Sequence, residues 1–380
     1  MKRRRSVFGR SGAVAVAVAA VAVVVLGALG GAGAASAKGH DGAAYTLSNQ
    51  KSGNAVLIFD READGSLTAA GSVATGGLGT GGGLGSQGAV VLAQDNHRLF
   101  AVNAGSDDVS VFDVNESGLT LVDRVASGGI RPISVAVHEN MLYSLNAGGA
   151  GNISGFLIAE NGKLTPIAGS IQPLTSGVAG PAEIAFTPEG DQLVVTEKAA
   201  NAIVTYDVSR GVASSPVSHT SNGATPFGFA FGRRNTLIVS EAFRGAADAG
   251  AVSSYRVSDD GDVNSVTASA PTHQTAVCWI VVTRNGQFAY GTNTGSGSIS
   301  GYEVASDGTL TLLNPNGRTG DTGAGSLPED EAISDGGRYL FALATGTHQL
   351  VGFRIGGDGS LTPAGAVGGL PAGTVGLAVR

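Results

Sequence analysis

Residues 132–167 read PISVAVHENMLYSLNAGGAGNISGFLIAENGKLTPI, and the rest of the chain can be interpreted outward from them. Four short segments rich in apolar residues predict consecutive strands, at 132–137, 142–146, 152–156 and 163–167. The last two segments are joined through Asn161-Gly162, a pair that tolerates the positive φ of a tight hairpin. The stretch therefore predicts a small antiparallel sheet of four strands.

The same unit recurs along the chain, with an aromatic residue at one equivalent position in each copy. These residues are Phe59, Phe112, Phe156, Tyr206, Tyr255, Tyr302 and Phe353. Consecutive members lie between 44 residues (112 to 156) and 53 residues (59 to 112) apart. A glycine follows six residues after the aromatic at Gly65, Gly118, Gly162, Gly261, Gly308 and Gly359, whereas the Tyr206 copy has Gly211. This period is typical of β-propeller blades, and we expect each ring to pack between neighbouring blades.

The two ends of the repeated region complete the ring. The first copy begins at its second strand, 45–48, and the chain finishes with a lone apolar segment, 375–379. We expect this last strand to pair with the first copy, because pairing removes an open sheet edge. The sequence thus predicts an all-β, seven-bladed propeller with four-stranded antiparallel blades, closed by the C-terminal strand into a ring.

The N-terminus has the layout of a signal peptide. Basic residues fill positions 2–5, an uncharged run covers 11–31, and Ala35-Ser36-Ala37 offers the small residues of a cleavage site. We expect removal of 1–37 and secretion of 38–380 as a single domain. A retained membrane anchor is the alternative, since the run is long enough to span a bilayer. The adjacent Arg4-Arg5 leaves general and twin-arginine export both open.

Composition narrows the classes of partner. The net charge of −7 includes the basic N-terminus, so the exported chain is more acidic and a poor match for nucleic acid or an anionic membrane. The single Cys278 excludes an internal disulfide framework, and we expect a buried, inert thiol there. No histidine pair has zinc spacing and no calcium loop occurs, so we expect no cofactor, with a calcium ion at clustered carboxylates left open. We expect a monomer.

The glycine-rich run 76–83 lacks a P-loop lysine and is interpreted as a flexible loop between blades.

One motif indicates a family. Residues 180–190 have the pattern Gly-Pro-x-x-Ile-Ala-Phe-x-Pro-x-Gly, and the apolar segments 193–197 and 203–206 come after this motif in the chain. Over the whole repeated region the chain resembles the seven-bladed lactonase family, which includes the propeller type of 6-phosphogluconolactonase and the carboxymuconate lactonising enzymes. The resemblance implies a small lactone as substrate, bound at one mouth of the central channel.

The resemblance is incomplete at the residues that carry the family's chemistry. Where family members place Arg and His just after Gly-Pro, this chain has Ala182 and Glu183. The family's Asn-Glu pair appears as Thr196-Glu197, and two further charged positions are replaced by the segments 225–227 and 276–279. The family's charged pocket is thus largely absent from this sequence.

Candidate site residues follow from the propeller topology, because loops leading into strand one and loops joining strands two and three open at the same mouth. The predicted catalytic residues are Glu197, Glu241, His273 and Arg244. The predicted binding residues are Arg131, Asn146, Glu183, Lys198, Asn293 and Glu331, with Asn103 and Asp330 in the same loops. Glu197 and Glu241 end equivalent strands, and convergence there would raise the pKa of one carboxyl and supply a general acid or base. The alternative is that both are solvated loop acids.

Two functions fit these observations. The first is a secreted, lactonase-like hydrolase or cyclase acting on a small acidic or sugar-derived lactone. The second is a non-enzymatic propeller that binds a glycan, a peptide or a cell-surface partner, and the missing Arg and His after Gly-Pro favour it.

Overall fold

Strands rather than helices dominate the chain, because short, largely buried apolar segments are separated by glycine-rich turns. The computed structural model describes residues 1, 40–116 and 118–380. The predicted signal peptide, 1–37, therefore lies outside the described residues apart from Met1. No helix in the described part of the chain has the length and apolar character needed to cross a membrane.

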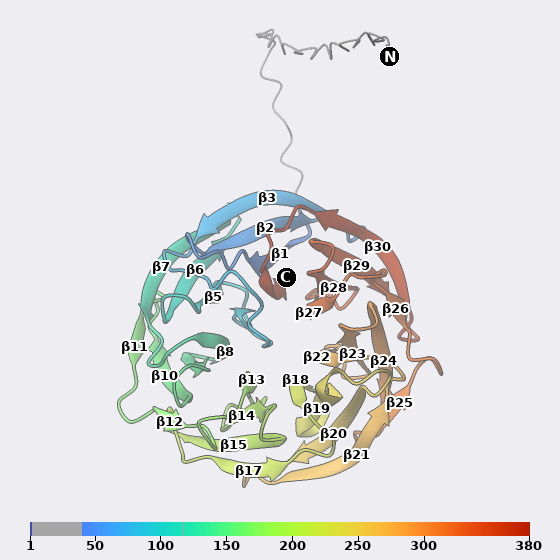
Figure 1. Ribbon diagram of the computed structural model, residues 1–380. Coiled ribbons are helices and arrows are strands. Elements are labelled where there is room, and N and C mark those ends of the chain that lie inside the picture. Colours follow the sequence, from blue (N-terminus) through green and yellow to red (C-terminus); the bar gives the residue numbers. More distant parts are fainter. Residues whose placement is uncertain (2–39, 117) are drawn as a thin grey trace. The chain divides into compact units, whose positions relative to one another are not determined.

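Seven antiparallel sheets follow one another around a central axis in the unit His40–Arg380 (Figure 1). The first blade contains β31 (Val375–Val379), β1 (Gly42–Leu47), β2 (Ala55–Arg61) and β3 (Leu67–Ala74). The second contains β4 (Val90–Leu92), β5 (Arg98–Asn103), β6 (Asp108–Asn115) and β7 (Gly118–Ala126). The third contains β8 (Pro132–His138), β9 (Met141–Asn146), β10 (Asn152–Ile158), β11 (Leu164–Pro166) and β12 (Gln172–Pro173).

The remaining blades repeat this order from the axis outward. The fourth contains β13 (Pro181–Phe186), β14 (Gln192–Glu197), β15 (Ala202–Ser209), β16 (Val212–Ala213) and β17 (Val217–Thr220). The fifth contains β18 (Pro226–Phe231), β19 (Thr236–Glu241), β20 (Ala251–Val257) and β21 (Val263–Pro271), with the short 3-10 helices η1 (Arg233–Asn235) and η2 (Phe243–Gly245) in its loops. The sixth contains β22 (Val277–Val282), β23 (Phe288–Asn293), β24 (Ser298–Val304), β25 (Leu310–Leu312) and β26 (Gly320–Asp321). The seventh contains β27 (Pro328–Ile333), β28 (Tyr339–Ala344), β29 (Gln349–Ile355) and β30 (Leu361–Gly368).

The C-terminal strand closes the ring as predicted. β31 pairs antiparallel with β1, with Ala44 opposite Val379, Tyr45 opposite Ala378 and Leu47 opposite Val375. The inner edge of β1 is therefore paired, and both ends of the ring lie in one blade.

The repeated aromatic residues are core residues, as predicted. All seven occupy the third strand of their blades and are at most 5% exposed. Tyrosine hydroxyls in this set also connect blades: Tyr302 donates to the Ala270 carbonyl at 2.9 Å and Tyr206 to the Pro173 carbonyl at 3.1 Å. The turn glycines that follow have positive φ, for example 87° at Gly65 and 82° at Gly359, which explains their residue type.

The segment leading into β4 crosses the central channel, where Figure 1 shows a blue-green loop reaching toward the axis. Gln87 bonds to the opposite side of the ring, because its Nε2 donates to the Ile280 carbonyl at 2.8 Å and its Oε1 accepts from the Ile280 amide at 3.0 Å. Its backbone amide donates to the Ala182 carbonyl at 3.1 Å. Trp279 Nε1 donates to the Ser86 carbonyl at 2.9 Å. Residues 84–88, here called the axial plug, thus connect the second blade to the fourth, fifth and sixth.

The glycine-rich run 76–83 lies between the first two blades, as expected, but it makes defined hydrogen bonds. The Asn49 side chain accepts from the Thr80 amide at 2.9 Å and donates to the Gly82 carbonyl at 2.7 Å. At Gly79 a Cβ would meet the Asn49 backbone at 2.1 Å, so glycine is required there by close approach.

Candidate functional site

Five of the seven blades end their second strand with Asn or Glu, and all five side chains are fully buried. They are Asn103, Asn146, Glu197, Glu241 and Asn293. The sequence placed them at the channel mouth, facing a ligand or solvent. Instead, each side chain is turned into its own blade and the loop beside it.

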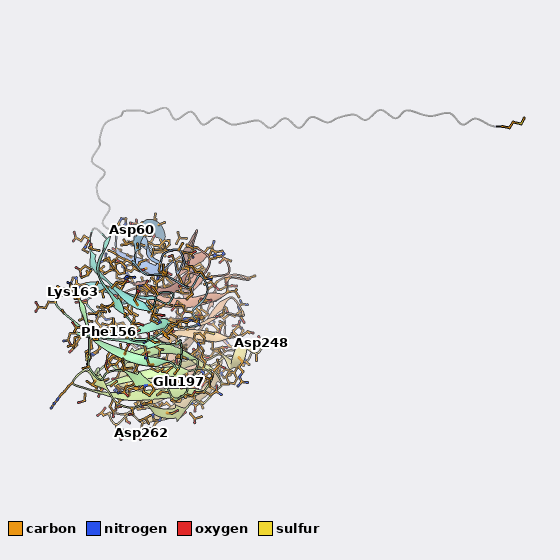
Figure 2. All side chains as sticks on the ribbon, turned by 60° about the vertical axis from the view of Figure 1, so that its left-hand side comes forward. Asp60, Phe156, Lys163, Glu197, Asp248 and Asp262 are labelled. Atoms are coloured by element: carbon orange, nitrogen blue, oxygen red, sulfur yellow. The ribbon has the colours of Figure 1, made fainter. Side chains whose placement is uncertain are left out.

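Glu241 is enclosed by donors. Its Oε1 accepts from the Gly223 amide at 2.8 Å and the Ser253 hydroxyl at 2.5 Å, and its Oε2 accepts from the Ser269 hydroxyl at 2.6 Å. Glu197 accepts from the Thr175 amide at 3.0 Å and from the Thr175 hydroxyl. In Figure 2 Glu197 lies among the strands, whereas Asp248 lies at the edge of the molecule. Neither glutamate is a solvated loop acid, and their predicted catalytic role, which the burial does not favour, stays a prediction.

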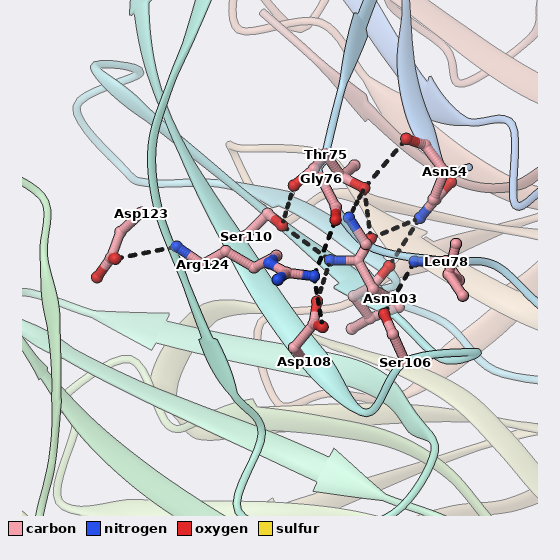
Figure 3. Close-up of polar contacts among 12 residues, drawn as sticks. Asn54, Thr75, Gly76, Leu78, Asn103, Ser106, Asp108, Ser110, Asp123 and Arg124 are labelled. Carbon is pink, nitrogen blue, oxygen red and sulfur yellow. Dashed lines mark hydrogen bonds and ion pairs between the residues drawn. The ribbon is translucent and has the colours of Figure 1, made fainter.

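Asn103 shows the same arrangement with an amide (Figure 3). Its Nδ2 donates to Asp108 Oδ1 at 2.6 Å and to Ser110 Oγ at 2.8 Å. Its Oδ1 accepts from Asn54 Nδ2 at 3.0 Å and from Thr75 Oγ1 at 2.6 Å. Every hydrogen-bonding position of this amide is therefore used.

A sequence signal for this structural role exists. In four of the five blades a serine stands two residues before the repeated aromatic and bonds to the strand-end residue. These serines are Ser110, Ser154, Ser253 and Ser300. Asn146 thus has the same structural role as Asn103. Asn293 donates to Ser298 and Ser300 in the same way, but its Oδ1 is buried without a hydrogen-bond partner within the described residues. The Glu197 blade has Val204 at that position, and Thr175 from the preceding loop supplies the donors.

The predicted loop residues His273 and Arg244 are exposed. Both have positive φ, 55° and 56°, and neither side chain makes a hydrogen bond or ion pair within the described part of the chain. They lie in adjacent loops of the fifth and sixth blades, and the structure brings neither into contact with Glu197 or Glu241.

Glu183, Asp330 and Glu331, which the sequence analysis assigned to loops at the mouth, lie on the inner strands β13 and β27. Glu183 accepts from the Phe229 amide at 2.6 Å, and Asp330 accepts from the Gly376 amide at 2.9 Å. Glu331 is 3% exposed, and both of its carboxyl oxygens lack a partner within the described residues. Burial raises the pKa of Glu183, Asp330 and Glu331 well above the ordinary carboxyl value. Burial therefore favours the protonated form of all three carboxyls.

The structure does bring Arg131 and Lys198 together, at a depression of about 330 Å³ between the third and fourth blades. Arg131 is exposed, and its guanidinium has no hydrogen bond or ion pair within the described residues. Lys198 Nζ lies 4.5 Å from the centre of the Phe227 ring and donates to the carbonyls of Pro181, at 3.1 Å, and Gly85. Burial, with a smaller contribution from the Arg131 charge, lowers the pKa of Lys198 to about 8.

Glu329 is a candidate that the sequence analysis missed. It is partly buried at the start of β27, and Thr345 Oγ1 donates to it at 3.4 Å. Burial raises the pKa of Glu329 to about 7. Glu329 lies at the start of β27, the innermost strand of its blade, and Lys198 directly follows β14, the second strand of its blade, so both residues lie at the same end of the ring. The acidic run Glu329-Asp330-Glu331 was the feature of the sequence that could have indicated this candidate. Which of its members faces the mouth is decided by a register shift between Pro328 and Glu331, which the sequence does not reveal.

An apolar cluster lies next to Lys198. The rings of Phe227 and Trp279 lie 4.9 Å apart and pack in one cluster with Ala182, Ala242 and Cys278. A bulge between Val277 and Trp279 breaks the alternation of side chains in β22, and Cys278 and Trp279 both pack in this cluster. Burial raises the pKa of Cys278 to about 12, so the thiol stays protonated at neutral pH.

Within residues 40–116 and 118–380, no group of three or more His, Cys, Asp or Glu side chains is arranged to hold a metal ion. The calcium ion that the sequence left open and the expected absence of a cofactor both stay predictions.

Comparisons with known proteins agree with this architecture. The family profile described as a lactonase, 7-bladed beta-propeller, matches residues 35–174 and 239–374. A search of curated proteins finds no match. Among solved structures, a provisionally named 6-phosphogluconolactonase from Bacteroides uniformis ATCC 8492 is similar, with 18% identity and a TM-score of 0.69 over 90% of this chain and 100% of the other. The periplasmic gluconolactonase PpgL of Pseudomonas aeruginosa has 16% identity and a TM-score of 0.68 over 88% and 99%. At these identities the two structures establish the fold alone.

Proposed function

Since the chain belongs to the seven-bladed β-propeller lactonase family, we propose that it is a lactonase-like hydrolase that opens a small lactone at the mouth bearing Arg131, Lys198 and Glu329. The observation that carries this proposal is the depression lined by both Arg131 and Lys198. The pKa of Lys198, lowered to about 8, and that of Glu329, raised to about 7, support it. Acid–base groups poised near the working pH are characteristic of catalytic sites.

Each group has a separate task in the proposed reaction. The Glu329 carboxylate takes a proton from a water molecule whose oxygen attacks the lactone carbonyl carbon. The Lys198 ammonium, placed at the same mouth, stabilises the negative charge that develops on the carbonyl oxygen. The acyl carbon–oxygen bond of the ring then breaks, and the leaving alkoxide takes the proton back from Glu329. The products are a hydroxy acid, which ionises at neutral pH, and the regenerated enzyme.

The exposed Arg131 guanidinium binds an anionic substituent of the lactone. It lines the same depression as Lys198 and has no partner within the described residues, so an incoming carboxylate displaces no existing ion pair. A guanidinium recognises a carboxylate through two parallel hydrogen bonds. This residue therefore orients the substrate rather than reacting with it.

The test is lactone hydrolysis by the purified chain lacking residues 1–37, followed by titration of the acid released. Glu329→Gln is expected to lower kcat by about 10²- to 10⁴-fold, because removing a general base removes its contribution to the transition state. The matched control is Glu303→Gln, an exposed acid on β24, which is expected to keep wild-type kcat. Unchanged kcat in Glu329→Gln would remove Glu329 from the reaction.

The pH profile of kcat/KM follows from the two shifted groups. The active form has Glu329 ionised and Lys198 protonated, so activity rises as pH passes the Glu329 pKa of about 7 and falls as pH passes the Lys198 pKa of about 8. A narrow maximum between these values is expected, and Lys198→Arg is expected to remove the alkaline limb. A profile that is flat from pH 6 to 9 would contradict the assignment.

A binding propeller without catalysis is the second candidate, and the replacement of the family's Arg and His by Ala182 and Glu183 favours it. It predicts saturable ligand binding at the mouth without turnover of any lactone. We further propose that the protein acts as a monomer outside the cytoplasm, supported by the signal-peptide layout of residues 1–37. A secreted chain beginning at Lys38 in culture medium is the expected result.

A further inference from the structure

The depression beside Arg131 and Lys198 has an unusual lining for a sugar-binding site. Its side chains are mainly aliphatic, including Leu84, Ile133, Leu174 and Val178, and several of its remaining positions are glycine or alanine. Apart from the two cations, the only polar side chain in this lining is Ser176. The lining side chains therefore offer positive charge and apolar surface but few groups for hydroxyls, and further polar contacts come only from backbone atoms.

A sugar-derived lactone needs more polar partners than this lining provides. Each hydroxyl that leaves water without a hydrogen bond lowers the affinity by about fivefold or more. The Lys198 ammonium is already bonded to the Pro181 and Gly85 carbonyls, which reduces the number of donors free for hydroxyls. A polyhydroxylated ring would leave several of its hydroxyls without a side-chain partner here.

Two aliphatic side chains at this mouth are exposed to solvent, and an apolar ligand bound there would cover them. Val178 is 81% exposed and lines the depression, and Ile130, next to Arg131, is 56% exposed. Covering such surface stabilises a complex by about 0.8 kcal/mol per methylene, which corresponds to about fourfold in affinity. The Phe227 ring beneath the Lys198 ammonium extends the apolar surface toward the channel.

We propose, on the basis of the proposed function, that the substrate is a lactone carrying a single anionic group on an otherwise aliphatic body without free hydroxyls. Arg131 binds the anion, the surface around Val178 covers the aliphatic part, and the lactone carbonyl lies toward Lys198. Sugar lactones are poor substrates for this chain.

The test compares matched lactones by titration of released acid. The first compound is a γ-butyrolactone with one carboxylate and a butyl substituent, and its partners are the methyl ester of that compound, a methyl-substituted analogue and glucono-δ-lactone. We expect kcat/KM for the butyl carboxylate to exceed that for glucono-δ-lactone by at least 100-fold. Esterification of the carboxylate is expected to lower kcat/KM at least tenfold. Each methylene removed from the butyl group is expected to lower kcat/KM about fourfold.

Variants assign these preferences to the depression. Val178→Ser is expected to remove most of the preference for butyl over methyl, whereas Val217→Ser, the same change at a 53% exposed position on β17, is expected to leave it unchanged. Arg131→Gln is expected to raise KM for the carboxylate without affecting the ester. Arg354→Gln on β29 is the charge-matched control.

A binding measurement separates this inference from the proposed function. The probe is the tetrahydrofuran analogue of the butyl carboxylate, which has no carbonyl to hydrolyse, and its binding is measured by calorimetry. Binding that depends on Arg131 and Val178 without turnover of any lactone would overturn the proposed hydrolysis but support the ligand class. Turnover with glucono-δ-lactone preferred would overturn the ligand class alone. Neither binding nor turnover would overturn both.

Discussion

At the scale of single residues, acidic side chains of this protein occupy three different environments. Glu241 and Glu197 are buried and accept hydrogen bonds, Glu331 is buried with no partner among the described residues, and Glu329 is partly buried at the mouth. Sequence type alone does not distinguish them, because all are glutamates at or near strand ends. The neighbouring donors and the burial decide whether a carboxyl is structural, protonated or available for chemistry.

Substituting Glu241 tests its structural role. Glu241→Ala leaves the Gly223 amide and two serine hydroxyls without their acceptor and is expected to lower the free energy of unfolding by about 3 kcal/mol. Urea unfolding measures this loss, and turnover per folded molecule is expected to stay at the wild-type value. Glu303→Ala at an exposed position is the control. Lost turnover with unchanged stability would instead support the catalytic role expected from the sequence.

The stability of the protein is expected to depend on pH through Glu331, whose buried carboxyl has no hydrogen-bond partner within the described residues. Burial raises its pKa above 4.5, so folding favours the protonated form. Its contribution to stability is fully present below the pKa of the unfolded chain and is lost as pH rises through the folded pKa. In the wild type, the free energy of unfolding is therefore expected to decrease as pH rises above 4.5. In Glu331→Gln this decrease is expected to be less steep, by up to about 1.4 kcal/mol per pH unit.

The slope against pH is the relevant readout, because the new amide also lacks partners and shifts absolute stability. Glu183 and Asp330 titrate with the same sign, so part of the slope is expected to remain. Glu303→Gln should keep the full wild-type slope. Equal slopes for Glu331→Gln and wild type would show that Glu331 is ionised in the folded protein.

At the scale of elements, bulges and loops decide what the channel presents. Register shifts in the inner strands β8, β13, β18, β22 and β27 interrupt the alternation of side chains. The axial plug then occupies the space between these strands, and its Gly85 carbonyl holds Lys198. The floor of the mouth is therefore built by a loop of the second blade rather than by the blades that carry the charged groups.

Removing the Gln87 side chain tests the plug. Gln87→Ala deletes the bonds to the Ile280 amide and carbonyl and is expected to lower the free energy of unfolding by about 2 kcal/mol. The specific readout is hydrogen exchange, since the Ile280 amide loses its acceptor and is expected to exchange faster. Gln349→Ala, at a partly buried position on β29, is the matched control. Unchanged exchange at Ile280 would show that the plug is held by its backbone alone.

At the scale of the whole molecule, closure joins residues that are more than three hundred positions apart. Leu47 lies opposite Val375, and the Asn49 side chain donates to the Gly373 carbonyl at 3.1 Å. Without β31 the inner edge of β1 would present unpaired backbone groups to the channel and to other molecules.

Deleting residues 372–380 is therefore expected to yield an aggregation-prone chain without a cooperative unfolding transition. Adding a peptide with the sequence of 372–380 is expected to restore the transition, because the peptide can occupy the place of β31. A scrambled peptide of the same composition is the control. A truncated chain that stays monomeric and unfolds cooperatively would show that closure by β31 is dispensable.

Much of the molecule was predictable from its repeats. The seven aromatic positions, the turn glycines and the apolar C-terminal segment were sufficient to predict seven four-stranded blades and their closure, and the structure confirms both. Local periodicity carries this information because each blade is built from neighbouring segments of chain, and the same packing problem recurs in each copy.

The candidate site was only partly predictable. Arg131 and Lys198 were identified because loop positions follow from topology, and the structure places both on one depression. Glu329 was missed and Glu197 and Glu241 were misplaced, because bulges reset the alternation of side chains and hydroxyls from adjoining segments turn strand-end carboxyls inward. The sequence by itself thus determined the number of blades and the order of their strands, which depend on contacts repeated along the chain. Only the tertiary structure decided which charged groups share the mouth, since that depends on side chains brought together once, across different blades.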